Sequence, residues 1–195
     1  MRKLIVSNIV SLDGSCEGPG GNVMALPMDA RFDAYNLERL QTADTLLRGA
    51  RTYRLFKGFW PSMRENPNAS PTHREISRLD DTLTKVVVSD SLSPADTNPW
   101  RETTRILRRA DAHRETAALK KGPGRDILVF GSHTLWNDLL EAGLVDELHL
   151  MVGAVVLGGG TPAFTRPVTS SSLRLLGART WEGSDNALLT YAKTP

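Results

Sequence analysis

Gly131 and Ser132 stand at the end of an apolar run and have the types and spacing that a bound phosphate requires. The run Ile127–Phe130 is typical of a buried strand, and a helical pattern begins directly after Ser132. A helix that starts at the end of a strand leaves backbone N–H groups and its positive pole free to bind an anion. We also expect Ser132 to cap this helix. The alternative interpretation is a tight strand-to-helix turn that serves packing alone.

Two aspartates stand at an expected turn and at an expected helix start. Asp13 lies in the segment Ser11–Gly14, and Asp29 follows Pro27 at the start of a helical pattern. A carboxyl group donates a proton near neutral pH only when burial raises its pKa, and it anchors polar groups when it is ionised. Both residues also have structural alternatives, since Asp13 suits a turn before glycine and Asp29 suits a helix cap.

The remaining reactive residues exclude several classes of site. Cys16 is the one cysteine in the chain, so an intrachain disulfide and a cysteine-based zinc site are both excluded. The four histidines stand too far apart for a metal-binding motif, and we expect no metal. The run Gly158–Gly160 lacks the lysine of a phosphate-binding loop and is typical of a tight turn.

Short apolar runs alternate with helical patterns along the chain, which predicts an α/β fold with a mostly parallel sheet. The predicted strands are Leu4–Val10, Asp44–Leu47, Lys85–Val88, Thr104–Leu107, Ile127–Phe130, Glu147–Val152 and a final antiparallel pair, Leu173–Thr180 and Ala187–Ala192. The predicted helices are Ala30–Gln41, Arg51–Phe56, Thr72–Leu79, Ala112–Lys120 and Thr134–Ala142. Three prolines in Lys57–Pro71 predict a surface loop there.

Length and composition predict one globular domain over residues 1–195. The net charge of +2 does not favour a nucleic-acid partner. Ser7 and Asn8 interrupt the apolar run that follows the basic residues near the start, so the pattern does not fit a signal peptide. No apolar run is long enough to span a membrane, and we expect a cytoplasmic protein with no membrane partner.

The run from Ile127 to Phe164, with the SLDG segment Ser11–Gly14 before it, resembles the dihydrofolate-reductase-like superfamily. It is most similar to the reductase domain of riboflavin biosynthesis, and the resemblance covers nearly the whole chain. It implies a three-layer α/β fold with a mixed, mostly parallel eight-stranded sheet, helices on both faces and a C-terminal antiparallel hairpin. It also implies NADPH as the hydride donor and frequent homodimers.

The resemblance assigns site residues one by one. Gly131 and Ser132 take the place of the pair that meets the cofactor pyrophosphate. The residues that follow them, and the segments around positions 49 and 89, complete the implied cofactor site: Gly49, Arg51, Thr52, Ser89, His133, Thr134 and Leu135. Ala50 occupies the position of the family arginine that contacts the 2′-phosphate. Arg51 or Arg48 would then have to replace it, and NADH is the alternative cofactor.

The sequence therefore predicts an NAD(P)H-dependent reductase acting on a small pteridine, pyrimidine or ribosylamine. The resemblance includes the reductase step on 5-amino-6-(5-phosphoribosylamino)uracil, with Asp29 and Asp13 as the catalytic candidates. The alternative is a module of the same fold that binds a cofactor or ligand without catalysis.

Overall fold

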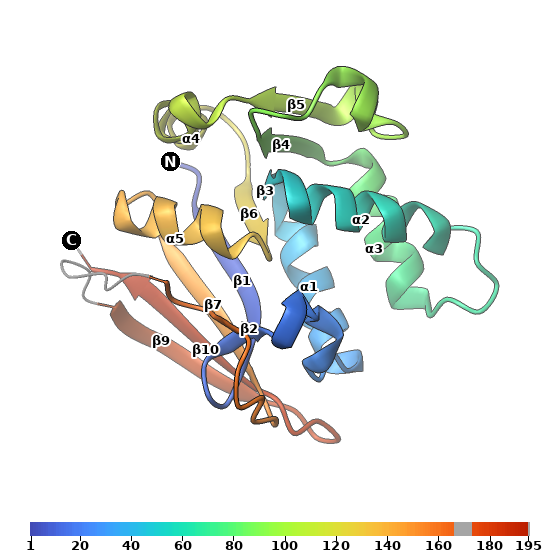
Figure 1. The fold of residues 1–195 in the computed structure, drawn as a ribbon, viewed down its shortest axis with the longest axis vertical. Helices are drawn as coiled ribbons and strands as arrows, with labels where there is room; N and C mark the ends of the chain where they lie inside the picture. Colours follow the sequence, from blue (N-terminus) through green and yellow to red (C-terminus); the bar gives the residue numbers. More distant parts are fainter. Residues whose placement is uncertain (166–172, 195) are drawn as a thin grey trace.

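The computed structural model describes residues 1–165 and 173–194 of the chain, which form a layered α/β structure (Figure 1). The strands are β1 (Leu4–Ser11), β2 (Ser15–Glu17), β3 (Ala43–Gly49), β4 (Thr84–Val88), β5 (Thr104–Leu107), β6 (Asp126–Phe130), β7 (Glu147–Gly153), β8 (Thr161–Pro162), β9 (Leu173–Thr180) and β10 (Ala187–Lys193). The helices are α1 (Ala30–Thr42), α2 (Ala50–Met63), α3 (Pro71–Thr82), α4 (Ala112–Lys121) and α5 (His133–Glu141). Short 3-10 turns join several of these elements.

Eight of the strands form one sheet in the order β5-β4-β3-β6-β1-β7-β10-β9. The first six are mutually parallel, while β10 runs antiparallel to both β7 and β9. The predicted mixed sheet with a C-terminal antiparallel pair is therefore confirmed. Because the parallel strands share one direction, the chain leaves β1, β3, β4, β6 and β7 at the same edge, where ligands bind in open parallel sheets.

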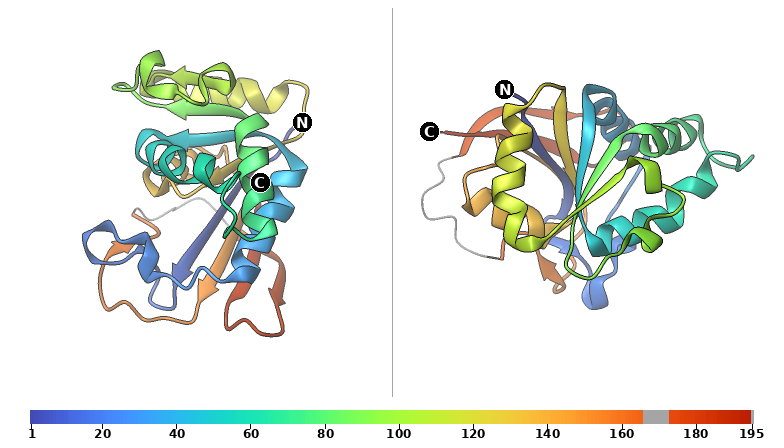
Figure 2. Two further views of the ribbon diagram at one scale, coloured as in Figure 1. Left: turned by 90° about the vertical axis from the view of Figure 1, so that its right-hand side faces the viewer. Right: turned by 90° about the horizontal axis from the view of Figure 1, so that it is seen from above.

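Helices cover both faces of the sheet, as the right-hand view of Figure 2 shows. Alternate residues of β1 explain this, since Leu4 and Val6 pack with α5 while Ile5 packs with α1 and α3. The central strands are apolar on both sides, so each helical layer finds a continuous surface to cover. Within the described ranges, no helix combines the length and apolar character that crossing a membrane requires.

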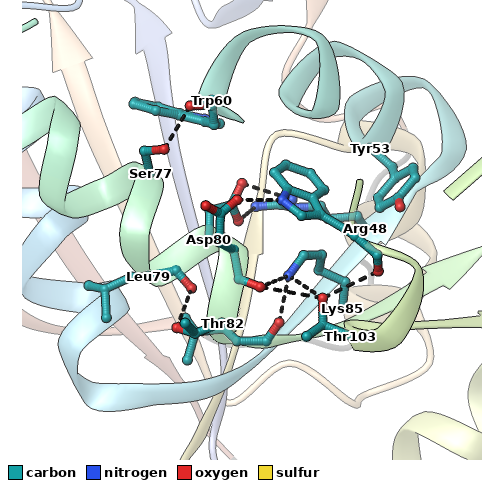
Figure 3. A network of polar contacts seen from close by, with 12 residues as sticks. Arg48, Tyr53, Trp60, Ser77, Leu79, Asp80, Thr82, Lys85 and Thr103 are labelled. Carbon is teal, nitrogen blue, oxygen red and sulfur yellow. Dashed lines mark hydrogen bonds and ion pairs between the residues drawn. The ribbon is translucent and has the colours of Figure 1, made fainter. Parts of the chain in front are cut away.

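The predicted loop over Lys57–Pro71 is wrong in its first half, because α2 continues to Met63. Phe56 and Trp60 lie one helical turn apart and both pack against the buried core, which favours the helix past Phe56. Ser77 donates a hydrogen bond to the Trp60 carbonyl at 2.7 Å, so this carbonyl near the helix end is satisfied (Figure 3).

A cluster of charged side chains is buried under α2 and α3 (Figure 3). Arg48 and Asp80 form an ion pair at 2.5 Å and are each 1% exposed. Lys85, 0% exposed, donates to the Leu83 carbonyl at 2.7 Å and to the Thr103 hydroxyl at 2.9 Å. These polar groups lie in the interior and fix the packing of α3 against the β3–β4 side of the sheet.

Candidate functional site

Two helices begin side by side at the edge of the sheet where β3 and β6 end. Gly49 precedes α2 and Ser132 precedes α5, and neither helix receives a hydrogen bond from its own capping side chain. The Gly49 N–H donates to Ser132 Oγ at 2.9 Å, which links the two helix starts. Each helix start carries a partial positive charge and N–H groups without an intrahelical acceptor. Their juxtaposition, which we call the cradle, favours a bound anion.

The backbone of the cradle turns sharply at the end of β6. Gly131 and Ser132 both adopt left-handed conformations, with φ of 57° and 56°. A Cβ on Gly131 would lie 3.2 Å from the Thr52 methyl group. This position therefore requires glycine both because of its positive φ and because a side chain would crowd Thr52. Asn8 Oδ1 accepts from the Gly131 N–H, and the Thr52 hydroxyl accepts from the Ser132 N–H, each at 3.0 Å. The turn is therefore held rigidly by side chains from β1 and α2.

These contacts correct two sequence-based expectations about Ser132. Its hydroxyl does not cap α5, because it accepts from Gly49 and bridges the two helices. Its N–H and that of Gly131 already have acceptors within the protein, which leaves the next residues, His133 and Thr134, to present their N–H groups at the helix start. Leu135 faces away from the cradle, since its side chain packs in the core and its N–H donates to the Ser132 carbonyl.

The basic residues predicted to bind a 2′-phosphate occupy very different surroundings. Arg48 is buried in its ion pair with Asp80 and is not available to a ligand. The Arg51 side chain is 66% exposed, lies in the first turn of α2 and forms an ion pair with Glu17 at 2.9 Å. Ser89 is buried, and its hydroxyl accepts N–H groups from the turn that follows β4. Arg51 therefore remains the candidate for phosphate binding.

Asp13 fixes two loops to one another at the ends of β1 and β7. Its carboxylate accepts hydrogen bonds from the Ser11 hydroxyl at 2.5 Å and from the N–H groups of Leu157 and Gly158 at 3.2 and 2.8 Å. These bonds, that from Ser11 foremost, hold the pKa of Asp13 below its ordinary value. The exposed carboxylate is therefore an anion at neutral pH and suits anchoring rather than proton donation.

Asp29 caps α1, as the alternative interpretation of the sequence proposed. Its Oδ1 accepts from the N–H groups of Arg31 and Phe32, and its Oδ2 accepts from the Ser184 hydroxyl at 2.5 Å. Burial raises the pKa of Asp29, but these hydrogen bonds together outweigh burial and hold the pKa below its ordinary value. A proton donor requires the opposite shift, so the geometry favours an anchoring or structural role.

Asn8 is a site residue that the sequence analysis did not single out. It interrupts the apolar run of β1, and its side chain reaches the end of β6 through the hydrogen bond to Gly131. Its amide nitrogen Nδ2 is buried and has no hydrogen-bond partner among the residues that the structure describes. Buried polar atoms normally have partners, so an unpaired donor on the strand beside the cradle is an exception. The polar pair Ser7 and Asn8 within the apolar run of β1 was the signal available in the sequence.

Comparison with known proteins identifies the family. Residues 2–188 match the family described as the RibD C-terminal domain. The chain belongs to this family. The uncharacterised protein YyaP of Bacillus subtilis is 32% identical to it over 180 residues, which cover 92% of this chain and 89% of YyaP.

Solved structures confirm that this RibD C-terminal domain has the dihydrofolate-reductase-like fold. A diaminohydroxyphosphoribosylaminopyrimidine deaminase/5-amino-6-(5-phosphoribosylamino)uracil reductase from Thermotoga maritima is similar to 99% of this chain and to 57% of its own, with a TM-score of 0.67 and 13% identity. The dihydrofolate reductase of Enterococcus faecalis, solved with NADP(H), has a TM-score of 0.59 and 17% identity, with 99% of this chain and 97% of its own covered. At these identities the likeness establishes the fold.

Proposed function

We propose that this RibD C-terminal domain is an NAD(P)H-dependent reductase of a small pteridine, pyrimidine or ribosylamine. The observation that carries the proposal is the cradle, in which the uncapped starts of α2 and α5 converge at the carboxyl edge of a parallel sheet. Its positive helix ends match the pyrophosphate of a dinucleotide. Similarity to the Thermotoga maritima deaminase/reductase supports the same assignment.

The residues present fit a nicotinamide cofactor. The N–H groups at the start of α5, on His133 and Thr134, would bind the pyrophosphate, and Asn8 Nδ2 offers a buried donor that lacks a partner within the described part of the chain. Arg51 would bind a 2′-phosphate by leaving or sharing its contact with Glu17. This phosphate binding would favour NADPH over NADH. When bound, the nicotinamide supplies the hydride, while the protein orients the reactants and excludes water.

The two aspartates take the role of substrate anchors. Asp13 and Asp29 are both anions at neutral pH, and a carboxylate pairs well with the N–H and amino groups of a pteridine or aminopyrimidine ring. Leu12 and Val156, two exposed apolar residues near Asp13, provide surface against which such a ring can pack. The reductase step on 5-amino-6-(5-phosphoribosylamino)uracil, named for the Thermotoga relative, is the first reaction to test.

The second candidate function is a module of the same fold that binds the cofactor without catalysis. The low pKa values of Asp13 and Asp29 favour it, since neither carboxyl group suits proton donation at neutral pH. The two functions differ in turnover and share cofactor binding. A homodimer remains the expectation for either.

The test measures NADPH binding by calorimetry in the wild type and in Gly131→Ala. An added Cβ would push Thr52 away and with it the hydroxyl that accepts from Ser132, so we expect at least about tenfold weaker binding. Gly183→Ala is the matched control, because Gly183 also has positive φ, at 76°, but a Cβ there meets nothing within 4 Å. Equal affinity of all three proteins would contradict the proposed cradle.

Turnover then separates the two candidates. Oxidation of NADPH with 5-amino-6-(5-phosphoribosylamino)uracil, slower in Gly131→Ala when NADPH is below saturation, supports the reductase. Tight NADPH binding without oxidation by this substrate, by dihydrofolate or by related aminopyrimidines supports the binding module.

A further inference from the structure

A hollow lies on the face of the sheet that α1 covers, and no residue of the cradle lines it. Its volume is about 320 Å³, and its walls come from α1, β7, β10 and β9. Tyr35 and Leu188 form part of its apolar surface, while Gly177 on β9 contributes no side chain. Small-molecule sites begin at about 300 Å³, so the hollow admits a ligand of modest size.

A chain of hydrogen bonds forms the polar wall of this hollow. Lys3 Nζ donates to Glu147 Oε1 at 2.7 Å, and His149 Nε2 lies 2.9 Å from Glu147 Oε2. His149 Nδ1 lies 2.7 Å from the Tyr35 hydroxyl. With Glu147 ionised, Nε2 carries the proton and Nδ1 accepts from Tyr35, an assignment that follows from the network. Each polar side-chain group in this series of hydrogen bonds therefore has a partner, and the charge of Glu147 is balanced by Lys3.

Among the residues 1–165 and 173–194, the remaining charges of the hollow leave one cation without a partner. Arg179 binds Glu38 through two hydrogen bonds of 2.9 and 3.2 Å, so these two charges cancel. Arg39 has no ion pair or side-chain hydrogen bond with any residue that the structure describes, and its Nε is buried and unpartnered. Its guanidinium lies 5.5 Å from the centre of the Tyr35 ring. Burial lowers the pKa of His149 most, and Glu147 raises it. The charge of Arg39 has the next largest effect and lowers this pKa further.

We propose that this hollow binds a small organic carboxylate, whose charge pairs with the Arg39 guanidinium and whose apolar body packs against Tyr35 and Leu188. The planar guanidinium matches a carboxylate through two parallel hydrogen bonds. The neighbouring Glu38–Arg179 and Glu147–Lys3 pairs are neutral, so the positive charge that no described residue compensates selects a ligand with one negative charge. The site is independent of the cradle and of the proposed reductase activity.

The test uses benzoate as the probe and benzamide as its uncharged counterpart, with binding followed by calorimetry and by NMR shifts. We expect saturable binding of benzoate to the wild type and much weaker binding of benzamide. Arg39→Gln should weaken benzoate binding at least about tenfold, because a charge-assisted hydrogen bond is lost. Arg78→Gln is the matched control, since Arg78 pairs with Glu75 on the exposed side of α3 and its loss changes the net charge equally.

A further variant tests the charge balance in the opposite direction. Glu38→Gln releases Arg179 from its ion pair and adds a second free cation to the hollow, so benzoate should bind more tightly than in the wild type. No saturable benzoate binding by the wild type, equal binding of benzamide, or unchanged affinity in Arg39→Gln would each overturn the proposal. NMR shifts confined to residues outside the hollow would also overturn it.

Discussion

Replacing Lys85 by methionine should remove a pH-dependent contribution to stability. Lys85 Nζ is buried, lies 5.0 Å from the centre of the Trp100 ring and has no carboxylate within ion-pairing distance among the described residues. Burial lowers its pKa from 10.5 to about 8, with a smaller contribution from Arg48, although Asp80 and Asp81 act in the opposite direction.

The sign and size of the effect follow from proton binding. Between pH 8 and 10.5 the unfolded chain keeps the Lys85 proton that the folded protein has released. The free energy of unfolding therefore rises with pH across this window, and the gap between the two pKa values corresponds to about 3 kcal/mol. Below pH 8 both states are protonated, and the folded protein carries the full cost of the buried charge.

Urea denaturation at a series of pH values measures this directly. Lys85→Met also loses the hydrogen bonds to Leu83 and Thr103, but that loss shifts the whole curve and does not change its slope with pH. We expect the wild type to gain about 3 kcal/mol relative to the variant between the two pH limits. Titration of Cys16 and Tyr35, whose pKa values burial raises, is common to both proteins and cancels in the difference. Lys121→Met, at an exposed lysine, serves as the control, and parallel curves for wild type and Lys85→Met would refute the reasoning.

Three further substitutions test the site and the buried ion pair. Ser132→Ala removes the acceptor of the Gly49 N–H, and calorimetry should show weaker NADPH binding in a protein destabilised by about 1 kcal/mol. Asp29→Ala removes the cap of α1 and should cost about 1 kcal/mol near neutral pH in urea denaturation, with NADPH affinity unchanged. Because the folded pKa of Asp29 is lowered, this contribution disappears as the pH falls below about 4. Asp80→Asn leaves Arg48 buried without its partner and should cost about 3–5 kcal/mol; a loss below 1 kcal/mol would contradict the burial of this pair.

The strands and the positions of the helix starts could be predicted because they follow from local pattern. Apolar runs such as Ile127–Phe130 supply apolar side chains to both faces of a central strand. Every predicted strand is confirmed within a few residues. Prolines gave a wrong boundary for α2, where packing of Trp60 against the core and the Ser77 hydrogen bond outweigh local preference. The short strands β2 and β8 were missed, since their pairing joins distant segments through few residues.

The partners of site side chains could not be predicted, because they depend on contacts between distant segments. Arg48 and Arg51 stand three positions apart, yet one is buried against Asp80 and the other is exposed at the start of α2. Ser132 has the sequence context of a cap, but the neighbouring helix start presents the Gly49 N–H to its hydroxyl. The role of Asn8 likewise became visible only when β1 and β6 were placed side by side.

Thermal unfolding of the wild type with graded NADPH tests the central claim most directly. A ligand at about 100 times its Kd adds about 2.7 kcal/mol of stability, which for a chain of this length raises Tm by about 5–11 °C. We predict that Tm rises with the logarithm of the NADPH concentration once this exceeds Kd, and that it rises less with NADH if Arg51 binds the 2′-phosphate. The absence of any shift with either cofactor, in a sample that unfolds cooperatively, would contradict a nucleotide site at the paired starts of α2 and α5.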